Sequence, residues 1–188
     1  PRLVATISGH NDNQDRIGFD LRQVATRALG KAAERCPRAF SKYATIAADA
    51  LHGCMQAHQS VLLHIDSTGA LVVNEIKKDL HSCVDTAAAA LMRLILSQRL
   101  QERAIPNEIL YIHKIIECAP LYHSYDLDHE AKEKNNLLLL DMLLSDWTTP
   151  ALSQLSSKGK LKAVDILTSL CHIQSHMDIT QEQIDRRV

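Results

Sequence analysis

Aromatic residues and long apolar runs are both scarce in this sequence. Aromatic side chains make up only 4% of the 188 residues, so a buried core has to consist of Leu, Ile, Val, Ala and Met. No apolar run approaches the roughly 20 residues that a membrane-spanning helix requires. The net charge of −1 gives no overall attraction to nucleic acid or to an anionic lipid surface. We therefore expect neither a membrane span nor a nucleic-acid partner.

The five cysteines fit neither a disulfide scaffold nor a zinc module. They are odd in number, lie far apart along the chain and include no C-x-x-C pair. The sequence also has no N-x-S/T glycosylation sequon. These features predict free thiols in a reducing, intracellular compartment, with the cytoplasm first and the nucleus second.

The usual linear signatures of catalysis are missing as well. The sequence holds no G-x-x-x-x-G-K-[ST], G-x-G-x-x-G, G-x-S-x-G or H-E-x-x-H motif. The segment "SSKGKLK" (156–162) is basic but lacks the spacing of a phosphate loop. The stretch 126–137 begins like a calcium loop but has Ala131 and Leu137 where such a loop needs glycine and glutamate. We therefore expect no cofactor and lean towards a protein without catalytic activity.

What is present is a helical pattern throughout. Apolar residues make up 46% of the chain and recur at intervals of three and four, the periodicity of an α-helix. The sequence therefore predicts an all-α fold of about seven helices, either a compact bundle or a HEAT-like α-solenoid. Residues 1–12 are expected to form an irregular arm. Residues 13–188 are expected to form a single α-helical domain taken from a longer chain.

Three helices carry specific predictions about the core. The first is expected to start near Asn13 and to bury one apolar stripe: Ile17, Leu21, Val24, Ala28 and Ala32. A long helix is expected up to about Glu102, with a break near His81–Ser82. Its expected apolar stripe is Val73, Ile76, Leu80, Val84, Ala87, Leu91 and Leu94. The last full helix is expected at about 160–177, after Gly159, with Asp178 capping a further helix. Its expected buried stripe is Leu161, Val164, Leu167 and Cys171.

A stripe of basic residues is the clearest surface feature. Its members recur at intervals of three or four from the first helix across Pro37: Arg27, Lys31, Arg35, Arg38 and Lys42. Such a stripe suits an acidic partner helix, phosphate groups or an anionic lipid surface. Few aromatic residues accompany the charges, so a nucleic acid is the less expected partner.

The segment "CHIQSHMD" (171–178) combines a cysteine with two histidines. His172 and His176 lie four residues apart and share the polar face of the predicted helix. Cys171 points about 100° away from His172, so the three side chains cannot easily hold one ion. We expect His172 and His176 to face solvent or a partner.

The segment "LHGCMQAH" (51–58) raises the possibility of a metal site across helices. Cys54 and His58 both fall on the apolar stripe of their helix, which is typical of core residues. A zinc site would need further ligands from nearby segments. The candidates are His64, His81 and Cys83.

The best candidate for catalysis lies around residues 119–127. His113 and Glu117 are four residues apart on the preceding helix, a spacing that lets a carboxylate orient an imidazole as a general base. Other reactive side chains follow: Tyr122, His123, Tyr125, Asp126 and His129. No nucleophile stands out among them, so no reaction can be specified.

The sequence thus favours a non-catalytic interaction domain, a scaffold or adaptor of a larger intracellular protein, that docks a peptide or helix of another, acidic protein. The expected contacts are Arg27, Lys31, Arg35 and Arg38, followed by His172 and His176. One alternative is an effector or GTPase-regulator-type domain that acts through a loop side chain such as His123 or Gln154. The other is a metal-stabilised domain built around Cys54 and His58.

Overall fold

The computed structural model describes residues 16–68, 74–119 and 129–185, and the side chains of 21–67, 76–119 and 135–171. The described residues are all-α and contain no strand, which confirms the predicted fold class. The expected arm at 1–12 lies outside the described residues. The helices are α2 Arg16–Arg35, α3 Pro37–Phe40, η1 Ser41–Tyr43, α4 Ala44–Thr68, α5 Asn74–Arg99, α6 Glu108–Cys118, α7 His129–Leu144, η3 Asp146–Thr148, α8 Thr149–Ser153 and α9 Ser157–Asp185.

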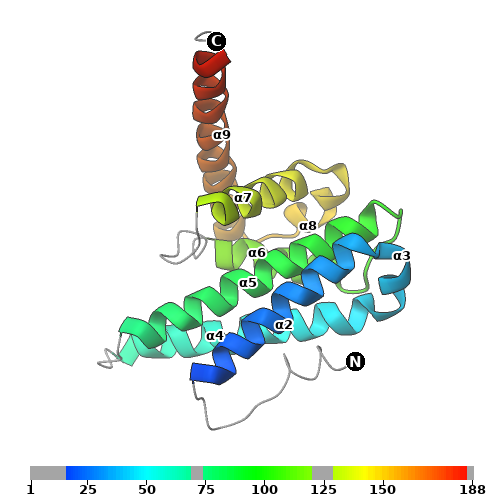
Figure 1. Ribbon diagram of the computed structural model, residues 1–188, viewed down its shortest axis with the longest axis vertical. Helices are drawn as coiled ribbons and strands as arrows, with labels where there is room; N and C mark the ends of the chain where they lie inside the picture. Colours follow the sequence, from blue (N-terminus) through cyan, green and yellow to red (C-terminus); the bar gives the residue numbers. More distant parts are fainter. Residues whose placement is uncertain (1–15, 69–73, 120–128, 186–188) are drawn as a thin grey trace.

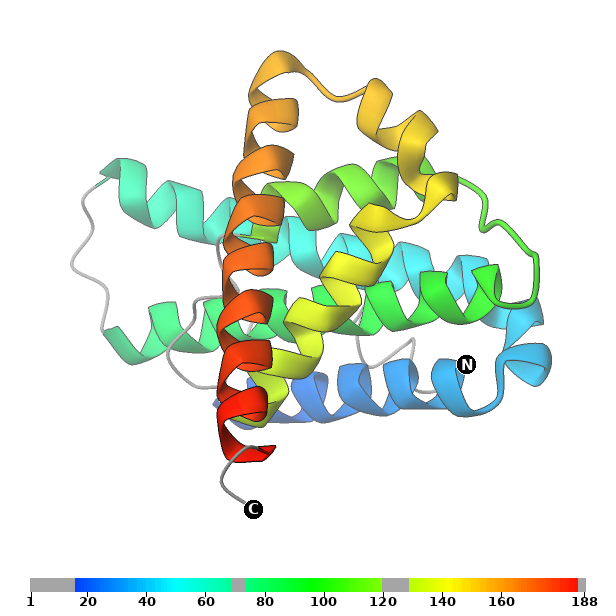
Figure 2. The same cartoon turned by 90° about the horizontal axis from the view of Figure 1, so that it is seen from above.

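Helix α5 lies at the centre of a compact bundle. Helices α2 and α4 run along it, and α6 and α7 also pack against it (Figure 1). Helix α9 packs on α6 and α7 and crosses the long helices at a steep angle (Figures 1 and 2). Because α5 contacts helices from both halves of the chain, the fold is a bundle and not a HEAT-like solenoid, in which each repeat contacts only its neighbours.

The composition of α5 explains its central position. Every residue from Ser82 to Met92 is buried, including the four alanines at 87–90. The segment Ile76–Arg99 is long and apolar enough to cross a membrane, but 83% of its most apolar window is buried inside the fold. The predicted break at His81–Ser82 is wrong, because α5 is continuous through both residues.

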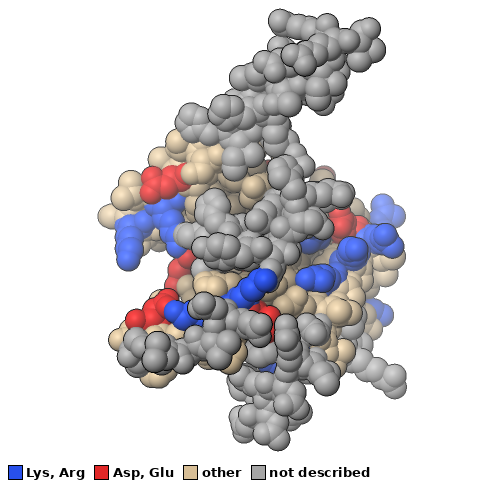
Figure 3. Space-filling view, turned by 60° about the vertical axis from the view of Figure 1, so that its left-hand side comes forward, with Lys and Arg blue, Asp and Glu red and all other residues tan. Residues whose placement is uncertain are grey.

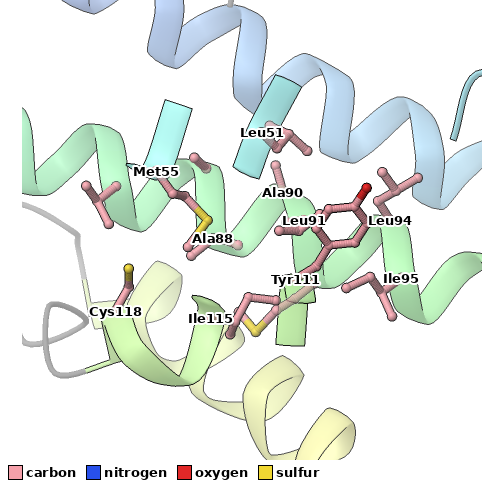
Figure 4. Close-up of a cluster of buried hydrophobic side chains, with 14 of the residues drawn as sticks. Leu51, Met55, Ala88, Ala90, Leu91, Leu94, Ile95, Tyr111, Ile115 and Cys118 are labelled. Atoms are coloured by element: carbon pink, nitrogen blue, oxygen red, sulfur yellow. The ribbon is translucent and has the colours of Figure 1, made fainter. Parts of the chain in front are cut away.

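A cluster of buried apolar side chains lies where α4, α5 and α6 meet (Figure 4). Tyr111 of α6 lies among Leu91, Leu94 and Ile95 of α5, and all four side chains are fully buried. The Tyr111 hydroxyl donates a hydrogen bond to Asp49 Oδ1 at 2.6 Å. Burial and this carboxylate together raise the pKa of Tyr111, so the hydroxyl remains a donor.

Helix α2 faces the core with a different side from the predicted one. Leu21 and Val24 are 57% and 59% exposed, and the residues that are buried instead are Ala25, Thr26, Leu29, Gly30 and Ala33. The reason is the close approach of α2 to α5. A Cβ atom at Gly30 would lie only 2.9 Å from Ala90 Cα, so this contact requires small residues on both helices.

The predictions for the last helix are wrong in three respects. Helix α9 begins before Gly159 and passes Asp178 without a break. Its start is fixed by Ser156, whose Oγ accepts a hydrogen bond from the Gly159 amide at 3.2 Å. Its stripe is also rotated: Ala163 and Leu170 are buried, Leu167 is half-buried, and the exposed members of the predicted stripe are Leu161, Val164 and Cys171.

Candidate functional site

The structure places the first three residues of the predicted basic stripe on the side of α2 that faces away from the core. Arg27, Lys31 and Arg35 are all exposed. At about 100° per residue, Lys31 lies about 200° from the buried Leu29, on the opposite side of the helix. We define the α2 outer face as these three basic residues and the exposed apolar residues beside them: Leu21, Val24, Arg27, Ala28, Lys31 and Arg35. Exposed Glu34 lies at the edge of this face, with its Oε2 3.8 Å from Arg93 Nε.

The charges of this face are not neutralised by the rest of the described structure. Within residues 21–67, 76–119 and 135–171, no carboxylate lies within ion-pair distance of Arg27, Lys31 or Arg35. Arg27 Nη2 donates a hydrogen bond to Gln23 Oε1 at 3.0 Å, which leaves its charge uncompensated. The guanidinium and ammonium groups are therefore available to an acidic ligand.

The two remaining members of the stripe lie beyond the end of α2 and have contacts of their own. Helix α2 ends at Arg35, Cys36 is not helical, and Pro37 starts α3. Arg38 Nε donates a hydrogen bond to Gln101 Oε1 at 3.2 Å, next to the end of α5. Lys42 Nζ lies 4.9 Å from the centre of the Tyr43 ring. Both side chains are exposed.

A cleft of about 510 Å³ opens at this end of α2, between α5, α7 and η3. Its walls include Glu34, Leu100 and Trp147, and Leu100 is 81% exposed. Arg99 forms part of the cleft wall. Its guanidinium donates bidentate hydrogen bonds to the buried Glu108 carboxylate and lies 4.9 Å from the centre of the Trp147 ring. This cleft could not be predicted from the sequence, because its lining residues come from three separate stretches of the chain.

Charge is distributed in patches over the described surface. Figure 3 shows Lys and Arg side chains in separate groups on one face of the molecule, with Asp and Glu among them. The net charge of the whole chain is only −1. An acidic partner would therefore be recognised by a local group of basic residues and not by the overall field of the protein.

The second predicted contact surface lies outside the described side chains. His172 and His176 both fall within α9, four residues apart in one continuous helix. Cys171, the last described side chain before them, is exposed. The predicted role of His172 and His176 as a partner-binding face remains a prediction.

The catalytic candidates on α6, His113 and Glu117, form hydrogen bonds with other groups and not with each other. His113 Nε2 lies 2.7 Å from the Ala151 carbonyl oxygen, so this nitrogen carries the proton and donates it. The Glu117 carboxylate accepts hydrogen bonds from Lys114 at 3.1 Å and from Gln59 at 3.3 Å. Among the loop candidates, Gln154 is exposed just after α8. Residues 120–128, which include His123, lie outside the described residues.

The metal hypothesis gains no support from the geometry. Among the described residues, no three His, Cys, Asp or Glu side chains are grouped so that they could hold a metal ion. Cys54 and Cys83 are buried, and burial raises the pKa of Cys54 to about 11 and that of Cys83 to about 12.

No protein-family model matches the chain, and neither the curated proteins nor the solved structures include a significant match to it. The function therefore has to be inferred from the surfaces and cavities described above.

Proposed function

We propose that this protein is an α-helical interaction domain, a scaffold or adaptor, that docks an acidic amphipathic helix of a partner protein along the α2 outer face. The observation that supports this most strongly is the combination of two features on one side of one helix. Leu21 and Val24 are more than half exposed, and Arg27, Lys31 and Arg35 follow beside them without a carboxylate partner among the described residues.

The two features have different roles in the proposed complex. Burying a Leu or Val side chain completely contributes about 1.5–3 kcal/mol, and Leu21 and Val24 are 57% and 59% exposed in the free domain. Each therefore has roughly 1–2 kcal/mol left to contribute. This is too little for stable binding on its own. The basic residues would raise the association rate and fix the orientation of an acidic partner.

The cleft at the end of α2 extends the surface. Leu100 and Trp147 offer apolar contacts there, and Arg38 lies beside them through its hydrogen bond to Gln101. A partner helix that lies along α2 can place one larger side chain in this cleft. This helix-on-helix arrangement is one of the common modes of peptide recognition.

An acidic helix fits this face better than a lipid membrane does. Basic residues near an anionic membrane contribute about 1 kcal/mol each, and the α2 outer face has three of them with two large apolar side chains. Membrane-surface helices usually combine a longer basic face with bulky Trp, Phe and Leu residues. We also propose an intracellular, reducing location, because all five cysteines are free thiols and Cys36 and Cys171 are exposed.

A selection from a library of displayed helical peptides tests the proposal without knowledge of the natural partner. The wild-type domain should enrich peptides with an apolar stripe flanked by Asp and Glu. The selected peptides should lose affinity at least tenfold for the double variant Arg27→Glu/Arg35→Glu. The matched control is Lys158→Glu/Lys160→Glu, which reverses the same number of charges on α9 and should bind normally.

Three results would overturn the proposal. The first is enrichment of peptides without an excess of acidic residues. The second is equal affinity of the selected peptides for the wild type and for Arg27→Glu/Arg35→Glu. The third is a selection that yields no acidic peptide, together with binding of the wild type to phosphatidylserine vesicles that Arg27→Glu/Arg35→Glu loses. This result would make the face a lipid-binding surface.

A further inference from the structure

A second cavity lies on a different part of the molecule from the α2 outer face. It has a volume of about 700 Å³, opens to solvent, and is lined by α4, α5, α6, the α8–α9 connection and the first turns of α9. Its apolar wall consists of Leu62, Leu63, Ile116 and Leu155. Both the size and the apolar wall are typical of sites for small organic ligands, which usually measure about 300–1,000 Å³.

The negative charges that line this cavity are already paired. Asp66 Oδ1 accepts a hydrogen bond from Lys77 Nζ at 2.8 Å. Glu117 Oε2 accepts one from Lys114 Nζ at 3.1 Å. Neither Lys77 nor Lys114 lines the cavity, so each carboxylate is paired from outside it. These ion pairs reduce the repulsion that Asp66 and Glu117 would exert on an anionic ligand.

The positive charges of the cavity have no such partners. Lys158 and Lys162 both line it, and within the described part of the chain no carboxylate lies within ion-pair distance of either. Lys162 Nζ donates a hydrogen bond to the backbone oxygen of Glu117, which holds the ammonium group at the wall. Burial is the main cause that lowers the pKa of Lys162; nearby Cys118 and Glu117 offset part of this effect, and the positive charges of Lys158 and Lys114 add to it. A bound anion would offset both the burial of the ammonium group and its repulsion from the other lysines.

We propose that this cavity binds a small amphiphilic anion, with the oxyanion head group at Lys158 and Lys162 and the apolar body against Leu62, Leu63, Ile116 and Leu155. An oxyanion satisfies ammonium groups that have no carboxylate partner. The apolar wall needs a ligand with a hydrocarbon or aromatic body, so a free inorganic ion fills only part of the site. Fatty carboxylates and organic phosphates of similar size share this chemistry.

The sequence contained one weak signal of this site. The segment "SSKGKLK" is basic, and its lysines 158 and 162 are the two that line the cavity. Lys160, between them, does not line it and is exposed. This alternation follows from the helix, because residues four apart share a face and residues two apart do not. Lys160 is therefore a natural control.

Fluorescence titration with 1-anilinonaphthalene-8-sulfonate tests the proposal, because this probe carries an anionic sulfonate on an aromatic body. The wild type should bind it at a saturable site. The single variants Lys158→Gln and Lys162→Gln should each weaken binding about tenfold, as expected for a lost hydrogen bond to a charged group. Lys160→Gln should bind like the wild type. Circular dichroism melts of each variant check that the fold is retained.

Competition distinguishes between the possible ligands. Octanoate and octyl phosphate should both displace the probe, and the tighter of the two identifies the preferred head group. Octanol, which lacks the charge, and inorganic phosphate, which lacks the apolar body, should displace it at least tenfold less well. Leu63 is 60% exposed and lines the cavity, so Leu63→Glu should abolish binding while the fold is retained.

The proposal is overturned if Lys158→Gln, Lys162→Gln and Lys160→Gln all bind the probe equally. It is also overturned if octanol competes as well as octanoate, or if Leu63→Glu binds like the wild type. These outcomes do not depend on the α2 outer face, because none of the substitutions lies on α2. The variant Arg27→Glu/Arg35→Glu should therefore bind the probe normally.

Discussion

Two helical glycines provide a sharp test of how closely α2 and α5 pack. Gly30 lies within α2, and a Cβ atom there would approach Ala90 Cα to 2.9 Å and Ala90 Cβ to 3.0 Å. Gly53 lies within α4 and is exposed, and a Cβ atom there would meet nothing within 4 Å. The same substitution, glycine to alanine, therefore has different steric consequences at the two positions.

The magnitudes follow from two opposing effects. In a helix interior, alanine is favoured over glycine by about 1 kcal/mol, and this gain applies to both variants. At Gly30 the added methyl group also forces α2 away from the backbone of α5, and overpacking of this kind costs about 1–3 kcal/mol. Gly53→Ala should therefore stabilise the protein by about 1 kcal/mol. Gly30→Ala should be neutral or destabilising by up to about 2 kcal/mol.

Urea unfolding followed by circular dichroism measures both free energies, and thermal melts provide a second reading. In a chain of this size, 1 kcal/mol corresponds to a shift of about 2–4 °C in the melting temperature. The expected result is a lower stability of Gly30→Ala than of Gly53→Ala by at least 1 kcal/mol. Equal stabilisation by the two substitutions would refute the close α2–α5 contact, and with it the reason for the exposed stripe on α2.

Three further predictions concern thiols, protons and metal. Ellman's reagent should modify Cys36 and Cys171 quickly and the other three thiols only after unfolding, because those three are buried and their pKa values are raised. Stability should fall as the pH drops from 7.5 to 5.5. Burial lowers the pKa of His52 and His81 in the folded state. In the unfolded chain both histidines have a pKa of about 6.5, so as the pH falls through this value the unfolded state binds more protons than the folded state. Urea unfolding at several pH values should show this slope, and His52→Phe should reduce it. EDTA should leave the melting temperature unchanged, since the described residues contain no metal cluster.

Each of these predictions has a clear contrary result. More than two fast-reacting thiols in the native protein would contradict the buried positions of Cys54, Cys83 and Cys118. Stability that rises on acidification, or a slope that His52→Phe leaves intact, would contradict the assignment to His52 and His81. A melting temperature that falls with EDTA, together with one equivalent of zinc in the purified protein, would revive the metal-stabilised alternative.

The sequence predicted the helices better than their orientations. The periodicity of α5 identified a long helix, and its predicted stripe is buried from Leu80 to Leu94, where burial on nearly all sides leaves little room for error in orientation. Ile76, predicted on the same stripe, is 45% exposed. The same reasoning failed for α2. There, Leu21, Val24 and Ala28 were expected inside and are exposed, because Gly30 and its neighbours allow a closer contact with the alanines of α5. Close packing of small residues is not visible in the sequence of one helix alone.

The candidate sites differ in the same way: a site within one helix could be predicted from the sequence, and a site built from several segments could not. The basic stripe on α2 could be read from sequence because it is local to one helix, and the structure shows Arg27, Lys31 and Arg35 exposed on one side. The cavity at Lys158 and Lys162 could not be predicted, because its apolar wall comes from α4, α6 and the α8–α9 connection. Pairing of His113 with Glu117 was predicted from their spacing, but contacts with α8 and α4 occupy the two side chains instead.

The central claim is that a partner helix lies on the α2 outer face, and lysine footprinting tests it most directly. The domain is reductively methylated with and without the selected acidic peptide, and the rate at each lysine is measured by mass spectrometry. Lys31, exposed on the α2 outer face, should react at least fivefold more slowly in the complex, and Lys160, exposed on α9, should react at its original rate. An unchanged rate at Lys31 in a saturated complex would contradict the claim and place the docking surface elsewhere.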